Sequence, residues 1–122
     1  MRASFLLIFL REWRNMEKTL DIDGKKVRFK ATGGTMLRYK MQFGREYLAD
    51  CAELAKVKKS NSIADIDLTP FYRIIWVLAK TADPDIPELL EWLDSFEHFP
   101  VLDIIEQLND VIGGNIKIDR KN

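Results

Sequence analysis

The chain has 122 residues, 47% hydrophobic and 31% charged, a composition typical of one globular domain rather than a disordered tail. Nineteen basic side chains balance nineteen acidic ones, so the chain lacks the broad positive field that binds a phosphate backbone, which argues against nucleic-acid binding. The single cysteine, Cys51, excludes a disulfide framework and a thiolate zinc site, and it predicts a small buried residue in a reducing cytoplasm.

The first fifteen residues carry an apolar run from residue 3 to residue 10. This run is far shorter than the roughly 20 residues that span a bilayer. The segment Arg11-Glu12-Trp13 follows it, where a signal peptide would have a small-residue cleavage site. We therefore expect neither a membrane span nor secretion. Residues 1–15 are interpreted as an extension, either an extra element or a stretch upstream of a translation start at Met16; the second is preferred because the first structural pattern begins directly after Met16.

A β-hairpin is predicted over residues 19–30. Asp23-Gly24 lies between two alternating segments, and this dipeptide favours a two-residue turn because both positions accept positive φ. The register places Asp21 opposite Lys26 as a cross-strand charge pair. The other side of the hairpin is apolar and consists of Leu20, Ile22, Val27 and Phe29. This apolar side should pack on the rest of the domain, since an isolated hairpin is not stable in water.

The next segment is predicted to be one helix from Met36 to about Lys56, with Thr35 as a cap. Its apolar stripe has three- and four-residue steps and consists of Leu37, Met41, Leu48, Cys51 and Ala55. Gly44 falls inside this helix and is interpreted as a packing notch or a kink. Residues 57–67 are polar and predict a linker.

Three further helices are expected. The second begins with Thr69 as N-cap and Pro70 at the first helical position, and its apolar stripe dominates its circumference. The third begins at Pro87, and the fourth follows Phe99-Pro100 and ends at Gly113-Gly114. The fold class is therefore mainly α (α+β): an N-terminal β-hairpin followed by about four short helices in one compact domain at 16–114. Residues 115–122 are interpreted as a polar tail.

The sequence predicts no enzyme, no cofactor and no metal site. His98 is the single histidine, and no metal-ligand or nucleophile motif surrounds it. Four carboxylates of the third helix share one side, as a solvated face does: Glu88, Glu91, Asp94 and Glu97. The chain has more large apolar residues than the core of four short helices needs, and tryptophan and tyrosine are enriched at interfaces. Composition therefore favours a binding surface over a catalytic site.

Four local strings carry a resemblance to a known family. They are Lys30-Ala31-Thr32, LRYKMQFGRE at 37–46, WVLAKTADPDIP at 76–87 and EWLDSF at 91–96. In this order and spacing, over about residues 16–112, the chain resembles the tail assembly chaperones of siphophages and prophages of Gram-positive bacteria.

The resemblance implies a function. Such proteins bind the tape measure protein, keep it soluble while tail tube subunits polymerise around it, and leave before the tail is finished. The implied partners are the phage tape measure protein and the tail tube protein, with possible self-association, no nucleic acid and no membrane, in the host bacterial cytoplasm. By resemblance, the second and third helices would bind the partner through Tyr72, Trp76, Trp92 and Phe96.

Two other functions remain open. A structural virion component, such as a tail completion or head–tail connector protein, would stay in the finished particle. A small regulatory binding protein would need a basic face or a DNA-reading helix, and the sequence shows neither.

Overall fold

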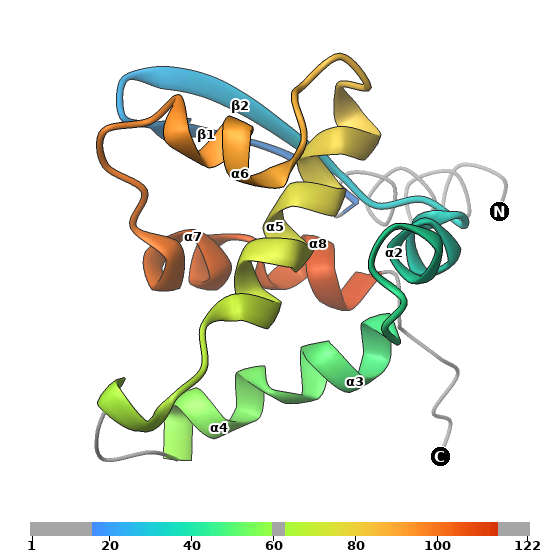
Figure 1. Ribbon diagram of the computed structural model, residues 1–122, viewed down its shortest axis with the longest axis vertical. Helices are drawn as coiled ribbons and strands as arrows, with labels where there is room; N and C mark the ends of the chain where they lie inside the picture. The colour runs from blue at the N-terminus through green and yellow to red at the C-terminus, as the bar shows by residue number, and fades with distance from the viewer. Residues whose placement is uncertain (1–15, 60–62, 115–122) are drawn as a thin grey trace, which may run out of the picture.

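The computed structural model describes residues 16–59 and 63–114 (Figure 1). The predictions for residues 1–15 and 115–122 lie outside the described residues. In chain order the elements are β1 (Glu17–Ile22), β2 (Lys25–Lys30), α2 (Thr35–Phe43), α3 (Tyr47–Ala52), α4 (Leu54–Lys59), a 3-10 turn (Ile63–Asp65), α5 (Thr69–Ala82), α6 (Leu89–Asp94), α7 (Val101–Gln107) and α8 (Asn109–Gly114). The predicted fold class is confirmed: an antiparallel hairpin precedes a set of helices.

The hairpin forms with the predicted register. Leu20 pairs with Val27, and Asp21 pairs with Lys26, whose ammonium nitrogen lies 3.6 Å from the carboxylate. Asp23 and Gly24 have φ values of 55° and 79°, as the two positions of a type I′ turn require. Leu20, Ile22 and Phe29 are buried, and β2 packs against α5.

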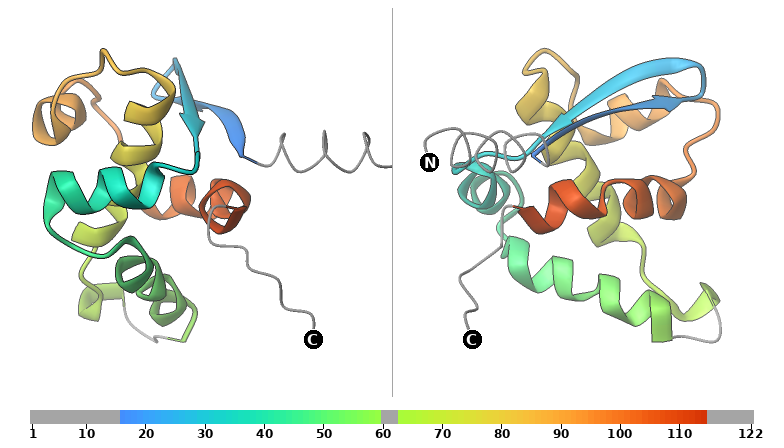
Figure 2. Two further views of the ribbon diagram at one scale, coloured as in Figure 1. Left: turned by 90° about the vertical axis from the view of Figure 1, so that its right-hand side faces the viewer. Right: turned by 180° about the vertical axis from the view of Figure 1, so that it is seen from behind.

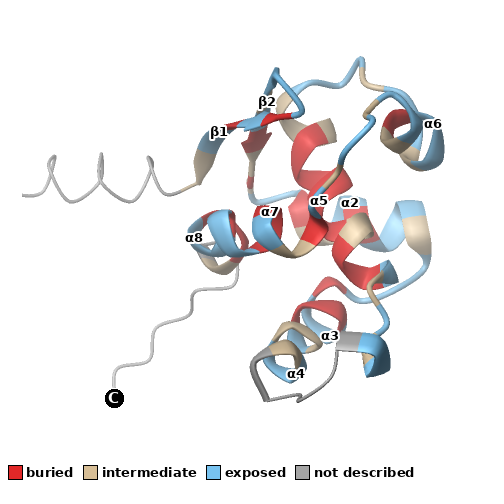
Figure 3. Cartoon of the chain, turned by 90° about the vertical axis from the view of Figure 1, so that its left-hand side faces the viewer, coloured by how far each residue is buried: buried red, intermediate tan, exposed pale blue. Residues whose placement is uncertain are grey.

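Helix α5 is the centre of the domain. The hairpin, α2, α3, α6 and α7 all contact it, and Figure 2 shows them arranged around it from two sides. Eight of its fourteen residues are buried, and buried residues are red in Figure 3: Pro70, Phe71, Ile74, Ile75, Trp76, Val77, Leu78 and Ala79. A helix that is apolar on most of its surface can only be stable when other elements cover it on several sides.

The single helix predicted from residue 36 to residue 56 is wrong. Gly44 adopts a φ of 71°, in the left-handed region, and its N–H donates to the Lys40 carbonyl oxygen at 2.8 Å. This is a C-terminal cap, and the chain leaves the helix there because glycine has no Cβ to oppose that conformation. The following residues form the separate short helices α3 and α4.

The predicted buried stripe of this region is also wrong for four of its five residues, since only Cys51 is buried and Ala55 is exposed. Leu37 is 63% exposed, Met41 78% and Leu48 53%. Helix α2 instead buries Thr35 and Tyr39 on its opposite side. The side of α2 that carries Tyr39 faces the core, because this aromatic side chain buries more apolar surface there than leucine or methionine would.

Helix boundaries differ from the prediction by one to three residues. Leu68, rather than Thr69, is the N-cap of α5, and the Asp67 carboxylate accepts a hydrogen bond from the Thr69 N–H at 3.0 Å. Pro87 lies before α6, whose N-cap is the extended residue Glu88. The last helix, α8, ends at Gly114, as predicted.

The remaining differences concern the linker and the last helix. The predicted linker at 57–67 is shorter, because α4 continues to Lys59 and residues 63–65 form a 3-10 turn. The fourth predicted helix is divided at Leu108 into α7 and α8. Within residues 16–59 and 63–114, no helix has the length and apolar character needed to cross a bilayer.

Candidate binding surface on helices α2 and α3

A buried carboxylate organises the contact between α2, α3 and α5. The side chain of Asp50 on α3 is 1% exposed. Arg45, in the turn between α2 and α3, donates to it at 2.8 Å, and Arg73 on α5 donates at 3.1 Å. The hydroxyl of Tyr39 on α2 donates to the same carboxylate. Four segments of the chain therefore meet at one side chain.

The electrostatics of this cluster favour the charged form of Asp50. Burial by itself raises the pKa of this carboxyl group, but the hydrogen bonds from Arg45, Tyr39 and Arg73 outweigh burial and lower the pKa to about 2. Burial and the hydrogen bond to Asp50 raise the pKa of Tyr39 well above its ordinary value, so its hydroxyl remains a donor. A paired buried charge of this kind costs several kcal/mol to unpair, so the cluster holds α2 and α3 in a fixed position on α5.

Ring contacts reinforce the inner side of α2. The Tyr39 ring lies 5.1 Å from Phe43 and 5.3 Å from Tyr47, both edge to face. Phe43 in turn meets Trp76 on α5 at 5.6 Å. Because edge-to-face pairs add to area burial, the inner side of α2 has one strongly preferred packing.

The outer side of the same two helices is apolar and exposed. We call Leu37, Met41 and Leu48 the α2–α3 apolar surface; they are three of the four large hydrophobic residues that are exposed in the described part of the chain. Leu37 and Met41 lie one helical turn apart and, with Gly34, Arg38 and Gln42, line a shallow hollow. Leu48 on α3 is exposed but does not line this hollow. Exposed apolar side chains on a rigid support are a feature of protein-binding sites.

One basic side chain lies in this hollow. Arg38 lines it and takes part in no salt bridge among the described residues. The other cations of this region are paired, Lys40 with Glu46 at 2.7 Å and Arg45 with Asp50 at 2.8 Å. The hollow therefore offers a partner two apolar side chains and one basic one.

Three of the four predicted partner-binding residues come together, but they pack on one another. Phe99 lies 6.0 Å from Tyr72, 5.6 Å from Trp92 and 5.3 Å from Phe96, measured between ring centroids. Trp92 is 5% exposed, and the other three rings are half-buried. Lys25 of β2 covers Phe96 at 5.0 Å. Most of the surface of these four rings is therefore in contact with other residues of the domain.

The fourth predicted residue, Trp76, is in the core. It is 1% exposed, its indole N–H donates to the Pro87 carbonyl oxygen at 2.9 Å, and Lys80 lies over its ring at 5.7 Å. In this fold Trp76 has no side-chain surface to offer a partner. It contributes indirectly, as the support on which Phe43 of α2 packs.

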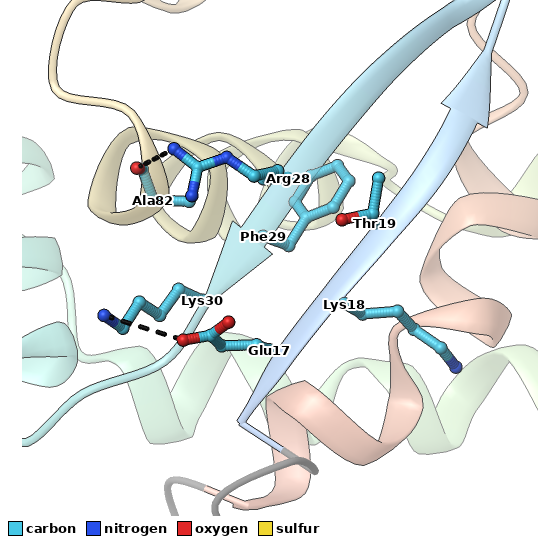
Figure 4. Close-up of a pocket in the computed structure, with 7 residues that line it drawn as sticks. All are labelled: Glu17, Lys18, Thr19, Arg28, Phe29, Lys30 and Ala82. Atoms are coloured by element: carbon cyan, nitrogen blue, oxygen red, sulfur yellow. Dashed lines mark hydrogen bonds and ion pairs between the residues drawn. The ribbon is translucent and has the colours of Figure 1, made fainter.

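A pocket of about 300 Å³ lies over the hairpin (Figure 4). Three of its lining residues are basic, but each cation already has a partner. Arg28 donates to the Ala82 carbonyl oxygen at 2.9 Å, and Lys30 pairs with Glu17 at 3.7 Å. Lys18 donates to the Gln107 carbonyl oxygen at 2.8 Å. The contacts of Arg28 and Lys18 fasten the hairpin to α5 and α7.

His98 and Cys51, the single histidine and the single cysteine, do not come together in the fold. His98 is exposed, and the part of the chain that the structure describes holds no group of side chains suited to a metal ion. Cys51 is buried, as predicted, and burial raises the pKa of its thiol to about 12, which suppresses the thiolate. No local sequence pattern indicates the pairing of Asp50, because its partners are separated from it by 5, 11 and 23 positions.

No protein-family model matches the chain, and the same holds for curated proteins and for solved structures.

Proposed function

We propose that this chain is a tail assembly chaperone that binds the tape measure protein of a phage through the α2–α3 apolar surface. The observation that supports this most is the exposure of Leu37, Met41 and Leu48 on helices that the Asp50 cluster fixes in place. A rigid helix with an apolar outer face fits the recognition of an amphipathic helix by its regularly spaced apolar residues.

The resemblance supports the same region. The string at 37–46 contains both Leu37 and Met41, together with Tyr39 and Arg45 of the Asp50 cluster. The tape measure protein is a long helical rod whose apolar face would recur along its length, so several copies of this chain would bind it side by side. Each contact would be small, so tail tube subunits could displace the copies one after another in the host cytoplasm.

Co-expression with the tape measure protein encoded downstream tests the proposal. The wild-type chain should keep that protein soluble and co-purify with it. The double variant L37S/M41S should largely fail to solubilise the tape measure protein and to co-purify with it, because serine removes the apolar contact at both positions. The matched control is L90S on α6, where Leu90 is 71% exposed and lies outside the α2–α3 apolar surface.

The outcomes separate the rival functions. Loss of binding in L37S/M41S together with normal binding in L90S supports the chaperone and its surface. If the tape measure protein co-purifies equally with the wild type and with both variants, the binding site lies outside the α2–α3 apolar surface. If the tape measure protein neither co-purifies nor changes in solubility, the chaperone proposal fails, and mass spectrometry of purified virions then tests the structural virion component.

A further inference from the structure

A second apolar feature of the domain is a groove between α4 and the pair α7 and α8. Its volume is about 440 Å³, and its two walls supply four aliphatic and two polar side chains: Leu54, Val57, Leu102, Ile105, Glu106 and Asn109. Leu54, Val57 and Leu102 are half-buried, so part of each side chain is uncovered. A concave apolar site with two walls is stabilised when an apolar segment fills it.

The edges of this groove carry both signs of charge. Glu106 lines the α7 wall, and residues 101–114 include no basic residue. The α4 wall is basic: Lys56 pairs with Glu53 at 3.0 Å, and two further lysines follow it in the sequence. Charge alone therefore selects no occupant, so the choice depends on the apolar lining and on the segments that can reach it.

A strongly apolar segment precedes β1 in the chain. Residues 5–10 are six consecutive large apolar residues, Phe-Leu-Leu-Ile-Phe-Leu. A run of this kind needs an apolar surface to cover it in water. The fifteen residues before Met16 are long enough for this run to return onto the domain.

The start of β1 places the segment near the groove. The Lys18 ammonium donates to the Gln107 carbonyl oxygen at 2.8 Å, which joins the start of β1 to the end of α7. Figures 1 and 3 show α7 and α8 between the hairpin and α4. Residues 11–15 span up to about 17 Å when extended, whereas a helix is about 10 Å across. Residues 5–10 can therefore pass around α7 and α8 and reach the groove.

We infer that residues 5–10 dock in the groove between α4, α7 and α8 of their own chain. A short linker holds the segment near the groove at an effective concentration on the order of 1 mM. Separate copies in a micromolar sample are far more dilute, so the tethered segment is the favoured occupant. Docking removes the six apolar side chains and the aliphatic walls from water together.

The groove suits this segment better than the α2–α3 apolar surface does. The hollow beside α2 has two large apolar side chains, Leu37 and Met41, and it contains Arg38, which takes part in no salt bridge among the described residues. Residues 1–15 include three arginines and one glutamate, so like charges would meet at that hollow. The groove has four aliphatic side chains and an acid, Glu106, at its edge.

The docked segment would act as an internal cover. While residues 5–10 fill the groove, apolar segments of other proteins are excluded from it, and the α2–α3 apolar surface stays free. The docking does not rest on the proposed function, because it involves one chain and no partner.

Thiol labelling of the full chain tests the docking. Asn109 is exposed and lines the groove, so N109C reports whether a segment covers it. The native thiol of Cys51 interferes little, since it is buried and its pKa is raised to about 12. With a soluble maleimide, N109C should react about tenfold more slowly beside the native segment than beside the variant segment L6S/F9S/L10S. That factor corresponds to about 1.4 kcal/mol of docking.

Two further probes and a dilution locate the contact. D94C on α6 and M41C on the α2–α3 apolar surface replace exposed residues, and each should react equally beside the native and the variant segment. The protection of N109C should not change when the sample is diluted about tenfold, because the contact lies within one chain.

Three results would overturn the inference. One is equal labelling of N109C beside both segments. Another is equal protection of M41C or D94C by the native segment, which would mean that the segment does not select the groove. The third is protection of N109C that falls on dilution, which would make a second copy the occupant. Because every sample lacks the tape measure protein, none of these results depends on the co-expression experiment.

Discussion

The guanidinium of Arg73 on α5 donates a 3.1 Å hydrogen bond to the carboxylate of Asp50 on α3, and their side chains are 15% and 1% exposed. This pair joins the central helix to the segment that carries the α2–α3 apolar surface. The hairpin, α2, α3, α6 and α7 all pack on α5, and within the described residues this is the salt bridge that joins α3 to α5. Its loss should therefore affect stability and partner binding together.

Replacement of Asp50 by asparagine tests this coupling. D50N keeps the shape of the side chain and removes the charge, which leaves Arg73 without its counter-ion. Breaking a buried pair in this way should lower the free energy of unfolding by about 3 kcal/mol. Urea unfolding gives the value, and D94N, an exposed carboxylate on α6, serves as the control and should change it by less than about 0.5 kcal/mol. Equal midpoints for the two variants would contradict a structural role for the pair.

The same carboxylate predicts a dependence of stability on pH. The pKa of Asp50 is about 2 in the folded chain, below its ordinary value of 3.8. A lowered pKa stabilises the fold above the unfolded value, and this contribution is lost as the pH falls from about 4 to about 2. The wild type should lose on the order of 2 kcal/mol over that window because of this group, and D50N should lack that part of the slope. Parallel pH curves for the two proteins would refute the assignment.

Two buried tyrosines allow a matched comparison. Tyr39 donates to Asp50, whereas the Tyr47 hydroxyl is buried beside the Cys51 thiol and makes no hydrogen bond of ordinary geometry to the described residues. Y39F should lower the free energy of unfolding by about 2 kcal/mol, since it removes a hydrogen bond to a charged group. Y47F removes only an unsatisfied hydroxyl and should leave stability unchanged or raise it by about 1 kcal/mol. Chemical denaturation of both variants measures these changes. If Y47F lowers the free energy of unfolding more than Y39F does, the Tyr47 hydroxyl has a hydrogen-bond partner in the folded chain.

Gly44 distinguishes a broken helix from a continuous one. An alanine in the left-handed conformation observed there costs about 1 kcal/mol, so G44A should be destabilised. In an unbroken helix from residue 36 to residue 56 the same substitution would stabilise the chain by about 1 kcal/mol. The sign of the change in thermal midpoint therefore decides between the two structures. The control is G33A, where a new Cβ meets open space and φ is not positive.

Sequence patterns determined the parts of this fold that depend on local chemistry. Asp23-Gly24 required positive φ at both positions, which fixed the hairpin and its register to the residue. The apolar stripe after Thr69-Pro70 predicted a helix, and the structure places that helix, α5, at the centre of the domain. The aromatic residues Tyr72, Trp92 and Phe96 were expected to bind a partner, and the structure places all three around Phe99.

Only the tertiary structure decided which side of α2 faces water. Two series of apolar residues run along this helix at four-residue steps, Leu37 with Met41 and Tyr39 with Phe43, and local periodicity favours neither. This side of α2 is buried because Tyr39 donates a hydrogen bond to Asp50 on α3 and Phe43 packs against Trp76 on α5. Those partners lie between 11 and 33 positions along the chain, and nothing in a local pattern brings them together. The exposed surface of α2 is thus a consequence of the buried one, set by a charge pair and ring contacts that exist only after α3 and α5 have packed.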